Sequence, residues 1–120
     1  LELAAFRLRA GKRAEAIAGL KKHLEQTRAK PETAWPRQIA EFLMGDLTET
    51  ELLLTARTGD AMTRRERTCE ATFYAGIARA ANDDADGALP LFRECSENAV
   101  PGFVEPPMAR AEISRLQGGR

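Results

Sequence analysis

Two segments of the chain repeat the same order of small and large apolar residues, and this repetition limits the folds that the chain can form. In each segment a polar turn is followed by an alanine and, four positions later, by a large apolar residue: Ala16 with Leu20, and Ala88 with Phe92. A four-residue step places both side chains on one face of an α-helix. The two alanines are 72 positions apart, about twice the length of a helix-turn-helix repeat unit. The pattern predicts stacked helical hairpins, with room for one further unit between these two.

The composition agrees with an all-α fold and excludes several classes of function. Alanine, leucine, arginine and glutamate are abundant and favour helices, whereas aromatic residues make up only 6% of the chain. The 18 basic and 18 acidic residues balance to a net charge of zero, which argues against a nucleic-acid partner. No stretch approaches the roughly 20 apolar residues of a membrane span, so we expect none in this chain.

We expect the chain to form one domain, which helix breaks and apolar stripes divide into four parts. We expect the end of a first unit in residues 1–30, a short and degenerate middle unit in 33–58, a third unit in 63–100 and a capping helix in 104–117. The capping helix should cover the exposed apolar edge of the stack. The predicted architecture is therefore a set of antiparallel helix-hairpin repeats, closed by one C-terminal helix.

Local signals predict where the helices begin. Thr48–Glu51 and Thr63–Glu66 both have the capping-box pattern, in which a threonine and a glutamate three residues later satisfy the first backbone amides of a helix. Asp83 or Asp84 is expected to cap the second helix of the third unit. Gly45 should end the first helix of the middle unit.

The third unit has a symmetry that pairs its residues across the hairpin. If the turn is centred near Asn82, positions equally distant from it face one another. The facing pairs are then Gly76 with Ala88, Thr72 with Phe92, and Cys69 with Cys95. The small pair lets the helices approach closely, and the cysteines are predicted to have adjacent thiols.

The sequence allows two interpretations of Cys69 and Cys95. In an oxidising compartment they would form a disulfide that stabilises the fold by about 3 kcal/mol in the chain-entropy treatment. In a reducing compartment they would be two small buried apolar side chains. A count of free thiols in the unreduced, denatured protein separates the two readings.

The chain has no arrangement of residues typical of catalysis. His23 is the only histidine, and it lies far from both cysteines, so no metal site is expected. No glycine-rich phosphate loop is present, and the carboxylates are spread along helices beside basic residues, as on a solvated face. We therefore predict no enzymatic activity, no catalytic residue, no metal and no cofactor.

Candidates for a binding surface lie on the first helices of the predicted units, since the first helices of a solenoid line its concave side. These candidates are Arg37, Glu41, Glu70, Phe73 and Ile77. Phe73 and Ile77 could instead be buried in the hydrophobic core and take no part in binding.

The third unit resembles the tetratricopeptide repeat. The sequence motif of that repeat has a small residue in the first helix, and a small and a large apolar residue in the second. Gly76, Ala88 and Phe92 hold these positions, and Pro101 follows where such a repeat commonly ends. A narrower resemblance is to NlpI-type bacterial lipoproteins, in the Cys69–Gly76 and Gly102–Glu105 segments. Pro106 departs from that family, whose relatives tend to have tyrosine there. The resemblance implies an envelope adaptor that holds a protease and cell-wall hydrolases together.

The expected function is therefore that of an adaptor or scaffold that binds a protein or peptide. The alternative is a structural module that caps a longer repeat protein or associates with itself, as a homo-oligomer would. The chain opens within a helical pattern and without an initiator methionine, which favours a fragment of a longer protein. The NlpI-type resemblance implies the bacterial periplasm or cell envelope, and a cytoplasmic location is the alternative.

Overall fold

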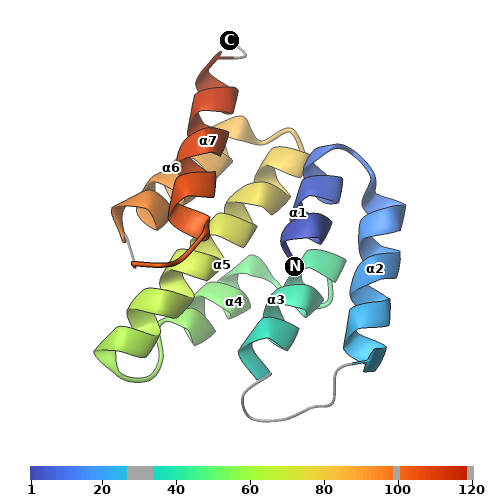
Figure 1. The fold of residues 1–120 in the computed structure, drawn as a ribbon, viewed down its shortest axis with the longest axis horizontal. Coiled ribbons are helices and arrows are strands. Elements are labelled where there is room, and N and C mark those ends of the chain that lie inside the picture. The colour runs from blue at the N-terminus through green and yellow to red at the C-terminus, as the bar shows by residue number, and fades with distance from the viewer. Residues whose placement is uncertain (27–33, 99–100, 119–120) are drawn as a thin grey trace.

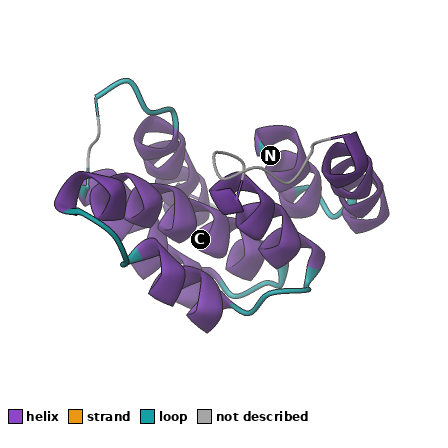
Figure 2. Ribbon diagram, turned by 90° about the horizontal axis from the view of Figure 1, so that it is seen from below, coloured by secondary structure: helices purple, strands orange, loops and turns teal. Residues whose placement is uncertain are grey.

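A computed structural model describes residues 1–26, 34–98 and 101–118, and in these ranges every regular element is a helix (Figure 2). The all-α prediction is therefore confirmed. None of the described helices combines the length and the apolar character that crossing a membrane requires. The helices are α1 (Glu2–Arg9), α2 (Arg13–Gln26), α3 (Ala34–Met44), α4 (Glu49–Ala56), α5 (Ala61–Ala81), α6 (Ala85–Glu97) and α7 (Glu105–Gly118).

Consecutive helices pack against one another in pairs. The pairs are α1 with α2, α3 with α4, and α5 with α6, and α7 then packs against α6. The predicted limits at residues 30, 33 and 100 fall outside the described residues. The arrangement of these hairpins as tetratricopeptide-type repeats remains a prediction.

The long helix α5 lies at the centre of the molecule and contacts helices from every hairpin (Figure 1). It packs against α1, α3, α4, α6 and α7. In a simple linear solenoid each unit contacts only its neighbours. Here α1 from the first hairpin contacts α5 of the third directly. The core is therefore one cluster around α5.

The α5–α6 interface contains the small and large residues that the sequence predicts there. A Cβ atom placed on Gly76 would lie 2.7 Å from Cε1 of Phe92, so Gly76 makes room for the Phe92 ring. The pairing of Gly76 with Ala88 and of Thr72 with Phe92 remains a prediction. Helical side chains lean toward the N-terminus of their own helix. In this hairpin Phe92 therefore leans toward the turn and reaches Gly76.

Side-chain caps begin three of the helices, and one of them differs from the prediction. Thr48 and Glu51 form the expected capping box at the start of α4, with Glu51 N donating to Thr48 Oγ1 at 3.1 Å. Helix α5 starts earlier than predicted, because Asp60 and not Thr63 is its cap, with Thr63 N donating to Asp60 Oδ1 at 2.8 Å. Asp84 caps α6, while Asp83 adopts a positive φ of 60° in the turn.

A buried glutamate on α7 joins the C-terminal helix to the N-terminal one. The Glu112 side chain is 6% exposed and pairs with Arg9 Nε of α1 and Arg115 Nε of α7, each at 2.8 Å. The arginines are more exposed, at 30% and 44%, so water screens part of the attraction. The Arg9–Glu112 ion pair therefore links α7 to α1.

Glu112→Gln should lower the free energy of unfolding by about 1–2 kcal/mol, because it removes a charge that two guanidinium groups share. Urea denaturation of the variant measures this loss. Glu15→Gln, at an exposed position in the first turn of α2, is the matched control and should change stability by only a few tenths of a kcal/mol. Equal losses in the two variants would contradict a structural role for Glu112.

Candidate binding site

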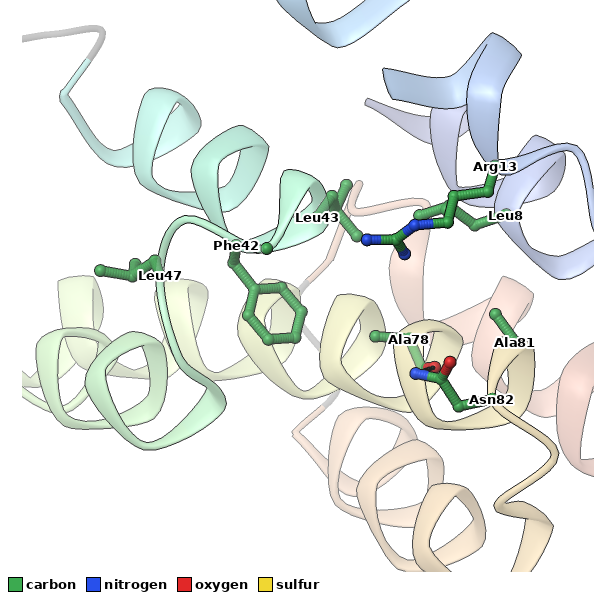
Figure 3. A pocket seen from close by; sticks show the side chains of 9 residues that line it. Leu8, Arg13, Phe42, Leu43, Leu47, Ala78, Ala81 and Asn82 are labelled. Carbon is green, nitrogen blue, oxygen red and sulfur yellow. Dashed lines mark hydrogen bonds between the residues drawn. The ribbon is translucent and has the colours of Figure 1, made fainter.

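A pocket of about 230 Å³ opens between the α1–α2 hairpin, α3 and the C-terminal end of α5 (Figure 3). Its wall is mostly apolar. The lining residues are Leu8, Arg13, Phe42, Leu43, Gly45, Leu47, Ala78, Ala81 and Asn82. Pockets for drug-sized ligands span roughly 300–1,000 Å³, so this one suits a single large side chain.

Arg13 is the one cation in this pocket wall, and it is not neutralised. Figure 3 shows its side chain extending from α2 toward Leu43, with the guanidinium over the space between α3 and α5. Within the described residues Arg13 makes no ion pair or side-chain hydrogen bond. The pocket therefore combines an apolar floor with a free positive charge at its edge.

Gly45 and Asn82 complete the rim of the pocket. Gly45 ends α3 with a φ of 90°, and a Cβ atom there would lie 3.7 Å from Arg13 Nη2, which places the guanidinium at this edge. Asn82 Nδ2 donates to the Ala78 carbonyl oxygen at 3.0 Å. In the described part of the chain nothing donates to Asn82 Oδ1, so this oxygen is available as an acceptor.

The structure places the predicted surface residues of α3 away from this pocket. Arg37 is half-buried, and its Nη1 donates to the Leu24 carbonyl oxygen at 3.2 Å, which ties α3 to α2. Glu41 is also half-buried on α3. Their role in protein binding remains a prediction.

Phe73 and Ile77 lie in the core and not on a surface. Phe73 is 1% exposed and Ile77 is 0% exposed. The Phe73 ring packs against Phe92 at 5.9 Å and against Tyr74 at 5.1 Å between ring centroids. Phe73 and Ile77 therefore lie in the core, which is the alternative to a concave binding face, and Phe92 of α6 covers part of Phe73.

Glu70 is half-buried in an acidic environment on α5. Burial is the main cause that raises its pKa to about 7, and the charges of Glu105 and Glu66 add to the rise. The indole N–H of Trp35 lies near Glu70 and favours its ionised carboxylate, which partly opposes the rise in the pKa of Glu70. The distance and angle of this contact do not meet the geometry of a hydrogen bond among the described residues. Burial also raises the pKa of the Glu105 carboxyl group, which is 6% exposed as a residue.

The raised pKa of Glu70 predicts a stability that depends on pH. The folded protein binds the Glu70 proton more tightly than the unfolded chain, whose pKa is near 4.5. The free energy of unfolding should therefore be highest below pH 4.5 for this group and fall as the pH rises to about 7. Glu70→Gln should flatten this fall and add on the order of 1–3 kcal/mol at pH 8.

Urea denaturation between pH 4 and 8 measures this effect for the wild type and the Gln variant. Glu25→Gln changes an exposed residue of α2 and is the control. Parallel pH profiles for wild type and Glu70→Gln would show that Glu70 ionises normally in the folded protein.

The two cysteines lie together, as the sequence predicts. Cys69 Sγ and Cys95 Sγ are 3.7 Å apart, and both residues are fully buried as free thiols. The hydrogen bond to Cys69 and burial both raise the pKa of the Cys95 thiol. The expected contact between the thiols is confirmed, and their oxidation remains a prediction.

Sequence reasoning missed the pocket and Arg13. One local signal was present, because Arg13 is the first residue of α2, where a positive charge is unfavourable against the helix dipole. Within the described residues no group of three or more histidine, cysteine, aspartate or glutamate side chains is placed to hold a metal ion.

No family model matches the chain, and no solved structure matches it either. The resemblances to the tetratricopeptide repeat and to NlpI-type proteins therefore remain predictions.

Proposed function

We propose that this protein binds another polypeptide and does not itself catalyse a reaction. The observation that supports this most strongly is the pocket between α3 and α5, which is large enough for one side chain and has an unpaired guanidinium at its edge. Peptide recognition commonly places apolar side chains of the ligand in such pockets and uses a few polar groups to orient it. The stacked hairpins supply a rigid frame for this surface.

The resemblance to NlpI-type proteins favours a partner in the bacterial envelope, such as a protease or a cell-wall hydrolase. This location is a proposal that rests on the resemblance alone. A pull-down from a bacterial envelope extract tests it. Recovery of cytosolic proteins alone would contradict it.

Selection of peptides from a displayed random library tests the binding function directly. Binders should be recovered on the wild type and lost on Ala81→Trp, which fills the pocket from α5. Ala111→Trp adds the same group at an exposed position of α7 and should retain them. Circular dichroism must first show that both variants are folded. Selected peptides that bind wild type and Ala81→Trp equally well would contradict the proposal.

A second candidate function is self-association, and the exposed face of α1 favours it. Leu3 is 60% exposed and Phe6 is 40% exposed, one helical turn apart. A second pocket of about 200 Å³ lies beside them between α1 and α2, and Leu3, Leu20 and His23 help to line it. Exposed apolar patches of this kind often mark contacts with other chains.

Mass measured by sedimentation over a range of protein concentrations distinguishes the two candidates. A dimer that forms in the wild type and is lost in Leu3→Ser/Phe6→Ser would support self-association through α1. A monomer at all concentrations would leave peptide binding as the function.

A further inference from the structure

Arg13 indicates which kind of peptide the pocket accepts. Within the described residues its guanidinium has no ionic partner. Asp46 follows Gly45 at the same rim, but it does not come within ion-pair distance of Arg13. An unpaired cation beside an apolar pocket is electrostatically complementary to an anion on the ligand.

The position of Arg13 in its helix strengthens this preference. It is the first residue of the 14-residue helix α2, where the helix dipole is positive. The guanidinium and the helix terminus therefore have the same sign of charge. A carboxylate near Arg13 would be favoured by both, and would relieve the unfavourable placement of a cation at a helix start.

We propose that the pocket binds a peptide segment in which a large apolar side chain is followed directly by an acidic residue. The apolar side chain enters the space between Phe42, Leu43 and Ala78, and the acidic side chain pairs with Arg13 at the rim. Asn82 Oδ1 accepts a backbone N–H of the peptide. This inference rests on the proposed function, because it names the ligand of the same pocket.

The flexibility of a glutamate favours a side-chain carboxylate over the α-carboxylate of a chain end. Arg13 Nη2 lies near Gly45, and Figure 3 shows the guanidinium over the space between α3 and α5. An α-carboxylate is attached to the same Cα as the buried side chain, so its position is fixed once that side chain enters the pocket. The three rotatable bonds of a glutamate on the next residue let its carboxylate reach the guanidinium.

Fluorescence anisotropy with three labelled peptides tests the assignment. All three have acetylated and amidated ends and flexible Gly-Ser flanks, and they differ only at the centre, which is Leu-Glu, Leu-Gln or Ala-Glu. The Leu-Glu peptide should bind the wild type most tightly. The Leu-Gln peptide should bind about fivefold more weakly, as expected for the loss of one partly exposed charge pair.

Variants of Arg13 test whether this residue recognises the negative charge of the peptide's glutamate. Arg13→Gln should weaken the Leu-Glu peptide about fivefold and leave the Leu-Gln peptide unchanged, because the pair is already absent there. Arg13→Glu should reverse the preference toward a Leu-Lys peptide. Lys12→Gln removes the neighbouring exposed cation, which does not line the pocket, and should preserve the Leu-Glu preference.

The outcomes separate this inference from the proposed function. If Leu-Glu and Leu-Gln peptides bind equally and both are lost in Ala81→Trp, the pocket binds peptides but the acidic preference is wrong. If only a peptide with a free C-terminal leucine binds, the ligand is a chain end and the assignment is also wrong. If no peptide responds to Ala81→Trp, the proposed function itself fails.

Discussion

Phe92→Ala should lower the free energy of unfolding by about 3–5 kcal/mol, the usual cost of removing a fully buried phenylalanine. The Phe92 ring has no exposed surface, fills the space beside Gly76 and contacts the ring of Phe73. It therefore joins α6 to the central helix α5. Since a domain of this size is stable by only about 5–15 kcal/mol, the loss would be a large fraction of the total. Urea denaturation followed by circular dichroism measures it.

Gly76→Ala provides the matched test of this contact. In the wild type the added methyl group would collide with the Phe92 ring and destabilise by about 1–3 kcal/mol, despite the higher helix propensity of alanine. In the Phe92→Ala variant this collision is absent, so Gly76→Ala should raise the free energy of unfolding of that variant by about 0.5–1 kcal/mol. Phe92→Leu serves the same purpose if Phe92→Ala does not fold. A Gly76→Ala effect of the same sign in all backgrounds would contradict the described packing.

Oxidation of Cys69 and Cys95 should stabilise the protein by about 3 kcal/mol relative to the reduced form, since the bridge closes a long loop in the unfolded chain. The two sulfur atoms are 3.7 Å apart and belong to residues 26 positions apart in sequence. Refolding in a mixture of reduced and oxidised glutathione gives the buried thiols access to the oxidant. Thiol–disulfide exchange then forms one protein disulfide and releases two glutathione thiols. Denaturation with and without reductant measures the gain.

Cys95→Ser is the control, because it removes one thiol and should make the stability independent of reductant. Two free thiols per chain after oxidative refolding would show that the sulfur atoms do not meet in solution. A disulfide that forms without stabilising the fold would show that the bridge strains the α5–α6 hairpin.

The part of the fold that the sequence predicts best is the α5–α6 hairpin. The symmetry about Asn82 correctly places Cys69 against Cys95, because short side chains equidistant from a turn meet directly. The same symmetry does not show that the Phe92 ring reaches Gly76, since a long side chain leans toward its helix N-terminus and meets a residue nearer the turn. The positions that face each other across a hairpin can therefore be predicted from the sequence. The residues that a large side chain contacts can be determined only from the three-dimensional structure.

The candidate binding site was not predictable in the same way. Its walls come from α1, α2, α3 and α5, and no local pattern brings Leu8, Phe42 and Ala78 together. The direct contact between α1 and α5 joins helices that are far apart in the sequence. Phe73 and Ile77 are buried, although their spacing along α5 is equally typical of a surface stripe. Pattern analysis finds apolar faces but does not show which of them a distant helix covers.

Titration of ¹⁵N-labelled protein with the Leu-Glu peptide, followed by backbone chemical shifts, tests most directly whether this protein binds a peptide in the pocket between α3 and α5. We expect the largest changes at Leu43, Gly45, Ala78 and Asn82, and we expect none of them in Ala81→Trp. Changes confined to Leu3 and Phe6 on α1, or to Glu41 and Glu70, would contradict it.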